Sequence, residues 1–285
     1  MLSFEVATSW DGFKWAIRRG ERFEHDRAVL SKGELSVLRA LNLLADSNKV
    51  FADVGSHVGY YTCRMAVKCR HVHAFEPNPE TLENLERNIR LNNLGNVTVH
   101  PIALGDRDEV KKLYSRSASS TLLEGYPSYD VVEVHVRRMD DVLDAVDIVK
   151  IDVEGYELNV LRGMKRILED CKPSLVIEHH DFRNYRIDTY PTISGMLRDM
   201  GYVEIYLAEP HRLYVSRGMI DDRFRSLIAD HWINFCIMNI KRGREWYIGL
   251  PEKWWWGMSL VDFIHELPSH VLEEPVWIEL LIRRM

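Results

Sequence analysis

The chain has 285 residues, of which 46% are hydrophobic and 28% are charged, a composition typical of a globular protein. The formal net charge of −6 provides no general attraction for nucleic acid, so we do not expect a nucleic-acid partner. No apolar run reaches the ~20 residues that span a bilayer, and the start lacks a signal-peptide core, so we expect a cytoplasmic protein without a transmembrane segment. The four cysteines form no CxxC pair, which argues against a zinc site or a disulfide framework.

The first elements are expected to form an N-terminal unit over residues 1–48. Residues 4–19 alternate between apolar and polar side chains around Asp11-Gly12, which predicts a β-hairpin. Apolar residues at helical spacing predict a helix over residues 35–44.

Residues 49–242 are predicted to form an α/β domain. Strands are expected at residues 50–54, 71–75, 97–100, 146–152 and 173–180, with helices at 58–67, 78–93, 156–168 and 193–200. Alternating strands and helices predict a doubly wound parallel sheet with both faces covered. Residues 106–140 instead alternate like antiparallel strands. The last two strands are expected at 201–209 and 231–241, with an insertion at about 209–230 between them.

Residues 243–285 form a tryptophan-rich extension that is predicted to end in an amphipathic helix over about 271–284. The cluster Trp254-Trp255-Trp256 could stack on a sugar or close over a substrate, could contact a second copy in a homodimer or a membrane surface, or could pack against the domain.

The stretch "FADVGSHVGYYT" follows the first predicted strand of the domain. Its two glycines, Gly55 and Gly59, do not complete the GxGxxG fingerprint of dinucleotide sites, and no phosphate-binding GK[ST] follows. Asp53 at the turn would repel a pyrophosphate but suits a cationic ligand with an α-amino group. Glu76 ends the next strand, where an acid can accept both hydroxyls of a ribose. Together these residues predict S-adenosyl-L-methionine as the cofactor.

With these residues assembled, the sequence resembles the FkbM family of S-adenosylmethionine-dependent methyltransferases. The resemblance is carried by "FADVGSHVGYYT", "VHAFEPNPETLENLERNIRLNN", "VTVHPIALGD", "RRMDDVL", "VDIVKIDVEGYELNVLRGM" and "PSLVIEH". It implies a class I methyltransferase fold, which is a Rossmann-like, mostly parallel sheet with an antiparallel last strand. It also implies O-methylation of a small-molecule or glycan hydroxyl. In this family the middle glycine of the first motif is replaced by asparagine or histidine, and His57 follows that variant.

The resemblance also implies roles for single residues. Asp53, Gly55 and Gly59 would line the methionine end of the cofactor, Glu76 would hold its ribose, and Asn78, Ala103 and Leu104 would border its adenine. The cofactor-binding set is therefore Asp53, Gly55, His57, Gly59, Glu76, Asn78, Ala103, Leu104 and Asp152. We expect the His57 side chain to point into or beside the acceptor cleft.

Methyl transfer to a hydroxyl requires positioning and removal of a proton. The candidates for this catalytic work are Asp152, Glu154, His179 and His180, with one of the two histidines turned toward the cleft. Lys150 lies in an apolar strand and is expected to pair with a neighbouring acid, such as Glu178. We expect a metal-free site in which Lys150 offsets the acids and a histidine takes the proton. Asp152, Glu178 and a histidine could instead hold a divalent ion, as in catechol-type methyltransferases.

Two other functions remain open at the level of sequence. "NLERNIRLNN" is similar to the tRNA guanine methyltransferases, but the acidic net charge and the absence of an NPPY-like motif argue against an RNA substrate. A non-catalytic binding module could keep the fold, but the presence of Asp53, Glu76 and Asp152 argues against it.

Overall fold

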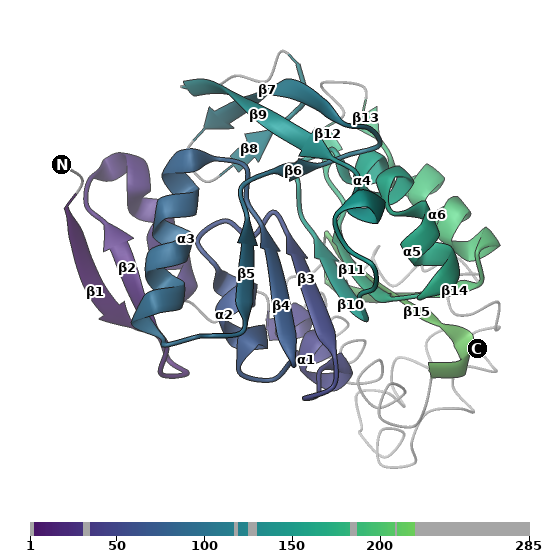
Figure 1. The fold of residues 1–285 in the computed structure, drawn as a ribbon, viewed down its shortest axis with the longest axis horizontal. Coiled ribbons are helices and arrows are strands. Elements are labelled where there is room, and N and C mark those ends of the chain that lie inside the picture. The colour runs from purple at the N-terminus through teal and green to yellow at the C-terminus, as the bar shows by residue number, and fades with distance from the viewer. Residues whose placement is uncertain are drawn as a thin grey trace, which may run out of the picture.

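The structure is a computed structural model that describes residues 3–30, 35–116, 119–124, 130–182, 187–208 and 210–219. Its central sheet has seven strands: β3 (Val50–Val54), β4 (His71–Phe75), β5 (Val97–His100), β10 (Ile148–Ile151), β11 (Ser174–Glu178), β14 (Tyr202–Ala208) and β15 (His211–Ser216). Their order is β14-β15-β11-β10-β3-β4-β5 (Figure 1). Strands β3, β4, β5, β10 and β11 pair in parallel, whereas β15 is antiparallel to both β11 and β14. The predicted class I methyltransferase sheet with an antiparallel last strand is confirmed.

One strand of the central sheet lies where no strand was predicted. Strand β15 occupies residues 211–216, inside the stretch that was expected to be an insertion. Its first two residues, His211 and Arg212, are polar but buried, because Glu178 and Glu204 pair with these two side chains. The predicted strand at 231–241 and the extension at 243–285 lie outside the described residues.

Helices cover both faces of the sheet (Figure 1). Helices α1 (Leu35–Leu44) and α2 (Tyr60–Ala66) pack with Phe51, Val72 and Ile148 on one face, where α3 (Pro79–Leu91) also packs, beside α2. The other face is covered by η2 (Met139–Asp141), α4 (Glu157–Gly163), α5 (Lys165–Asp170) and α6 (Tyr190–Asp199). Among the described residues, none of the helices has the length and apolar character needed to cross a bilayer.

The single helix predicted over residues 156–168 is two helices, α4 and α5. The break follows Gly163, where a Cβ atom would lie 1.8 Å from the carbonyl oxygen of Gly105. This close approach requires glycine and brings the junction of the two helices against Gly105. Periodicity alone does not reveal such a contact.

The N-terminal hairpin and the helix at 35–44 are confirmed. Strands β1 (Phe4–Thr8) and β2 (Lys14–Arg18) are followed by η1 (Glu21–Leu30). The hairpin docks on α3, where the Asn88 side chain accepts from Ala16 N and donates to the carbonyl of Val58. A buried ion pair joins Arg18 to Asp26 at 2.8 Å. The N-terminal hairpin therefore packs directly against α3.

A second sheet lies above the central one in Figure 1. Its strands are β6 (Ala103–Leu104), β7 (Glu109–Arg116), β8 (Ser119–Thr121) and β9 (Asp130–Arg137), in the order β6-β9-β7-β8. The antiparallel strands predicted within 106–140 are β7 and β9, and the shorter β6 and β8 had no sequence signal. A short pair, β12 (Asp181–Phe182) and β13 (Ile187–Asp188), and η4 (Arg217–Met219) complete the described elements.

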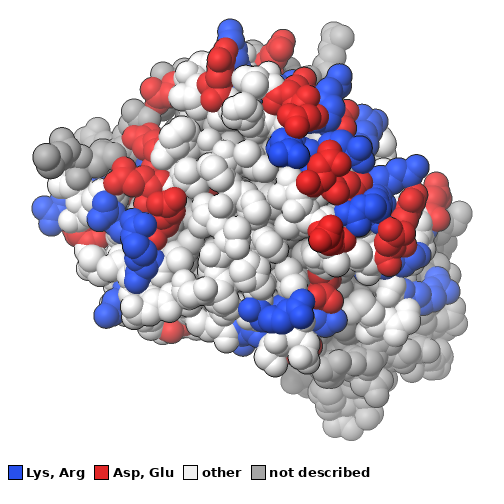
Figure 2. All heavy atoms as spheres, viewed as in Figure 1, with Lys and Arg blue, Asp and Glu red and all other residues white. Residues whose placement is uncertain are grey.

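The face seen in Figure 1 is uncharged at its centre. Figure 2 shows acidic and basic side chains of the described residues gathered around the sides of this face, with both signs intermingled. This face therefore carries no continuous basic stripe among the described residues.

Candidate active site

A cavity of about 340 Å³ opens at the carboxyl ends of the central strands, beneath the second sheet. Its lining includes Val54, Gly55, Ser56, His57, Val58, Glu76, Ile102, Ala103, Leu104, Leu113, Leu122, Lys150, Asp152, Glu154, Tyr156 and Glu178. In doubly wound sheets this edge is where ligands bind, and the volume is within the ~300–1,000 Å³ range of small-molecule sites.

The glycine turn after β3 forms one wall of the cavity. Gly55 has a φ of +82°, and a Cβ atom there would lie 1.8 Å from the carbonyl oxygen of Asp152. His57 has a φ of +51°, in the left-handed region that histidine and asparagine enter more readily than most other side chains. This explains why histidine can replace glycine in the middle of the motif. Gly59, with a φ of +94°, faces Leu85 of α3, so it serves helix packing.

Glu76, at the end of β4, is held by two backbone amides. The N–H of His57 donates to Oε2 at 2.9 Å, and the N–H of Asn78 donates to Oε1 at 2.8 Å. The side chain is 5% exposed, and burial raises its pKa to about 7, although the two amide hydrogen bonds act in the opposite direction. The carboxylate is thus fixed in the cavity wall with a lone pair on each oxygen still available.

Asp53 lies behind the lining. It is 1% exposed, and its Oδ2 accepts a hydrogen bond from Thr62 at 2.6 Å. Its Oδ1 is buried and has no hydrogen-bond partner among the described residues. Burial raises the pKa of Asp53, and the charge of Lys150, its neighbour across the β3–β10 pair, opposes that rise. Asp53 therefore stabilises the turn and the start of α2 from behind the cavity lining.

The residues predicted to border the adenine lie near the second sheet. Ala103 and Leu104 are buried and line the cavity. Asn78 caps α3 through its side-chain oxygen, which accepts from Glu80 N. The Asn78 amide donates to the hydroxyls of Ser115 and Ser120, at 3.1 and 3.3 Å, and so connects α3 to the second sheet.

Lys150 is 2% exposed and pairs with Asp152, with its Nζ 2.6 Å from Oδ2. The expected ion pair is therefore present, but the acid that forms it is Asp152, just after the end of β10, and not Glu178 as suggested from the sequence. Burial would raise the pKa of Asp152, but the charges of Lys150 and His180 hold it well below its usual range. Asp152 is thus a permanent negative charge at the cavity.

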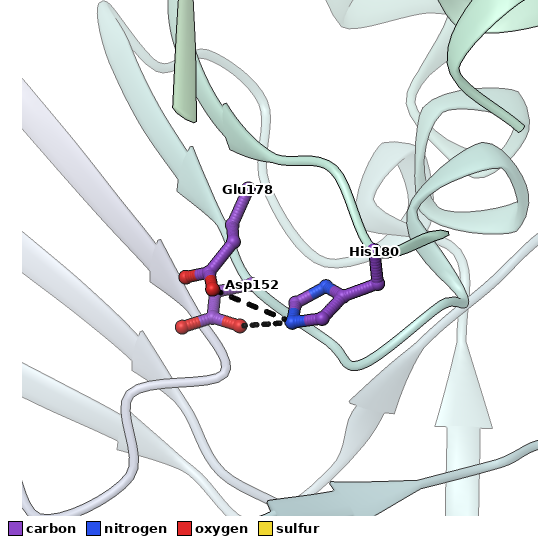
Figure 3. A group of neighbouring side chains, drawn as sticks. All are labelled: Asp152, Glu178 and His180. Atoms are coloured by element: carbon purple, nitrogen blue, oxygen red, sulfur yellow. Dashed lines mark ion pairs between the residues drawn. The ribbon is translucent and has the colours of Figure 1, made fainter. Parts of the chain in front are cut away.

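The imidazole of His180 has four carboxylates nearby, two of which, Asp152 and Glu178, are drawn in Figure 3. Its Nδ1 lies 2.9 Å from Oε1 of the fully buried Glu157. Its Nε2 lies 3.4 Å from Glu178, 3.4 Å from Glu154 and 3.8 Å from Asp152. Burial would lower the pKa of His180, but the hydrogen bond with Glu157 and the nearby negative charges outweigh it and raise the pKa to about 9. His180 is therefore an imidazolium near neutral pH in the free protein.

His179 points the other way. Its Nε2 forms a 3.0 Å hydrogen bond with the hydroxyl of Tyr214, and its ring meets that of Tyr190 edge-on. Burial is the main factor that lowers the pKa of His179 to about 3. Consecutive side chains at a strand end face opposite sides, so only His180 faces the acidic group. The position of His179 does not support its predicted catalytic role.

Several cavity residues had no signal in the sequence. Ala28 and Val29 reach the cavity from η1, and Tyr60 and Tyr61 reach it from α2. Glu157 is the first residue of α4, where an acid is usually explained by the helix dipole. Its contact with His180 could not be seen without the structure.

The chain is similar to known proteins in sequence and in structure. The model of the Methyltransferase FkbM domain matches residues 53–204. The hexuronic acid methyltransferase AglP of Haloferax volcanii is 30% identical over 156 residues, with 52% of this chain and 63% of that protein covered. Methyltransferase 1 of Beauveria bassiana is 26% identical over 179 residues, with 53% of this chain and 70% of that protein covered.

Among solved structures, the Methyltransferase FkbM of Methylobacillus flagellatus KT is similar at 19% identity and a TM-score of 0.43, with 69% of this chain and 55% of that chain covered. The present chain spans less than two thirds of the length of the Haloferax volcanii protein. The family model, however, matches more than half of the chain. The chain belongs to the FkbM methyltransferase domain family.

Proposed function

We propose that the chain is an S-adenosyl-L-methionine-dependent methyltransferase that methylates an oxygen of a small molecule or glycan. The observation that carries this proposal is the order of chemical groups along the sheet edge. The strand order β5-β4-β3-β10-β11 places apolar residues 102–104, then Glu76, then the glycine turn, then Asp152, then Glu178. This succession is suited to adenine, ribose, the methionine chain and the methyl acceptor, in that order.

The residues present fit this cofactor. Leu104, Leu113 and Leu122 offer an apolar surface for a purine, and Glu76 offers two fixed acceptors for ribose hydroxyls. The sulfonium and the ammonium of the methionine end are cations, and the negative charge of Asp152 favours cations at that end.

When bound, the cofactor supplies a methyl group whose bond to sulfur breaks with its electron pair left on sulfur, so the acceptor oxygen needs alignment and loss of its proton. Alignment is the larger contribution. His180, with a pKa of about 9, cannot accept that proton near neutral pH. Among the acids at the cavity, Glu154 has a pKa raised by burial, which makes it a better proton acceptor than Asp152. We therefore propose Glu154 as the base and His180 as a positioning residue.

The Haloferax volcanii relative is named a hexuronic acid methyltransferase, which supports a sugar as the acceptor class here. The carboxylate of such an acceptor would be repelled by Asp152, Glu154 and Glu178 unless a cation neutralised part of their negative charge. An RNA acceptor has less support, because Figure 2 shows no continuous basic stripe among the described residues of that face. The cytoplasmic location and the homodimer through residues 243–285 stay predictions.

Isothermal titration calorimetry with S-adenosylmethionine tests the proposal. We expect one site per chain, and binding weaker by about 5- to 150-fold in Glu76→Ala, equivalent to ~1–3 kcal/mol for the loss of a charged acceptor. The matched control is Glu83→Ala, which removes an exposed acid of α3. This variant should bind the cofactor as the wild type does. Equal affinity in wild type and Glu76→Ala would remove Glu76 from the cofactor site. Transfer of labelled methyl to hexuronic acids, neutral sugars and RNA then distinguishes the acceptor classes.

A further inference from the structure

In the acidic group around His180, one oxygen of each of two carboxylates faces the Nε2 atom of the histidine. Nζ of Lys150 pairs with Oδ2 of Asp152, and Nε2 of His211 lies 3.0 Å from Oε2 of Glu178. The other oxygen of each carboxylate, Oδ1 of Asp152 and Oε1 of Glu178, faces Nε2 of His180 (Figure 3). Two carboxylate oxygens and one imidazole nitrogen thus converge on one point.

We propose that Asp152, Glu178 and His180 form a site for a divalent cation of the Mn²⁺ type, and that Glu157 is a positioning residue for the histidine. The three donor atoms lie within 4.8 Å of one another. The distances from His180 Nε2 are 3.4 Å to Glu178 and 3.8 Å to Asp152. Neighbouring donors around an ion with bonds of about 2.1 Å are separated by about 3.0–3.4 Å, so small side-chain movements would complete the set.

An independent feature of Glu157 also points to a cation. Its side chain is fully buried, and its Oε1 accepts from the backbone N–H of Gly155 at 2.9 Å as well as contacting Nδ1 of His180. Its Oε2 is buried without a hydrogen-bond partner among the described residues. A carboxylate that orients the far nitrogen of a histidine is the usual support of a metal-bound imidazole. Here it leaves Nε2 turned toward Asp152 and Glu178.

The balance of charge and the access to the site agree with an ion. Asp152, Glu154, Glu157 and Glu178 all lie within contact distance of the His180 ring. Lys150 and the His180 imidazolium offset part of this negative charge, and a divalent ion would offset more of it while His180 Nε2 releases its proton. The side chains of Asp152 and Glu178 are 27% and 18% exposed and line the cavity, so an ion can enter from it.

The donor set also decides the class of ion. One imidazole with two carboxylates suits an ion that accepts both nitrogen and oxygen ligands, and three protein ligands leave coordination positions for water or an acceptor oxygen. If the proposed methyltransferase function is correct, an ion here would hold an anionic or hydroxylated acceptor at the cavity. Its binding, however, can be measured without cofactor or acceptor.

Electron paramagnetic resonance of the full chain titrated with MnCl₂ alone tests this site. We expect one bound Mn²⁺ per chain, with affinity at least tenfold lower in His180→Gln and in Glu178→Gln. Glu157→Gln should weaken binding by about 10- to 100-fold, the usual effect of losing a carboxylate behind a metal-bound histidine. His135→Ala and Glu133→Gln, on exposed positions of β9, are the matched controls and should bind as the wild type does.

Thermal unfolding of each variant shows whether it is folded, and calorimetry with S-adenosylmethionine is a separate readout, since Glu76→Ala should weaken the cofactor and leave Mn²⁺ binding intact. The proposal is overturned if the wild type binds no Mn²⁺ at this stoichiometry. It is also overturned if His180→Gln and Glu178→Gln, both folded, bind Mn²⁺ as tightly as the controls. In that case the protonated His180 imidazole, and not a metal ion, would neutralise the carboxylates around it.

Discussion

The backbone N–H of His57 donates a hydrogen bond to Oε2 of Glu76 at 2.9 Å, which joins the turn after β3 to the end of β4. A residue with a positive φ thereby positions the acid proposed to bind the ribose. Burial raises the pKa of this acid to about 7, so its charge changes within the physiological range. Two predictions depend on this property.

Cofactor affinity should depend on pH through Glu76. The ionised carboxylate is the better acceptor for ribose hydroxyls. The groups that act on it are the amides of Asn78 and His57, which lower its pKa, and the charges of Asp53 and Asp152, which raise it. With a pKa of about 7 in the free protein, S-adenosylmethionine should bind up to about tenfold more tightly at pH 8 than at pH 6. Calorimetry at both pH values checks this, and the dependence should disappear in Glu76→Gln.

The free energy of unfolding should show the opposite trend. The folded pKa of Glu76, about 7, is above the ordinary glutamate value of 4.5. The protonated acid therefore stabilises the folded state below pH 4.5, and this contribution is lost as pH rises through 7. Relative to wild type, Glu76→Gln should therefore become more stable by ~3 kcal/mol between pH 4.5 and pH 8. Urea unfolding at several pH values measures the difference, with Glu83→Gln as the control. A constant difference across this range would contradict the assignment.

Gly55 should be intolerant of a side chain. Its φ of +82° and the contact of 1.8 Å that a Cβ would make with Asp152 O mean that Gly55→Ala must distort the turn or separate β3 from β10. We expect a loss of ~2 kcal/mol or more in the free energy of unfolding. Gly95→Ala is the control, since a Cβ there meets nothing within 4 Å. Equal stability of the two variants would show that the turn can adjust.

The two adjacent histidines should differ in what they affect. His179→Ala removes the hydrogen bond to buried Tyr214, so it should lower the free energy of unfolding by ~1–3 kcal/mol while leaving cofactor affinity unchanged. His180→Ala should reduce methyl transfer far more than His179→Ala does. Chemical unfolding and a transfer assay on the same preparations measure both effects. A larger loss of transfer in His179→Ala would restore the role predicted from the sequence.

Most of the fold could be predicted because its strands and helices are strongly periodic. Strands β3, β4 and β5 and helix α1 were located from apolar runs alone. The failures are instructive. Strand β15 begins with His211 and Arg212, which look exposed until Glu178 and Glu204 are known to face them. The break after Gly163 depends on Gly105, which is distant in sequence.

The sequence predicted most of the residues of the site but not which of their side chains contact one another. Parallel strands end at one edge, so Glu76, Asp152 and Glu178 could be placed together from the sequence. The sequence could not show that Lys150 pairs with Asp152, because side-chain partners at a strand end depend on which face each residue takes. The roles of His179 and His180 depend on the same alternation. Glu157 was overlooked because this helix residue contacts His180, which follows β11 and is distant in sequence.

The most direct test of the account is a crystal structure of the chain with S-adenosylhomocysteine. We predict that both ribose hydroxyls contact the Glu76 carboxylate, that the adenine lies against Ala103 and Leu104, and that the sulfur lies on the side of Asp152. The His57 side chain should remain at the cavity. A nucleoside bound away from Glu76, or a ribose held by other residues, would contradict the proposed cofactor site.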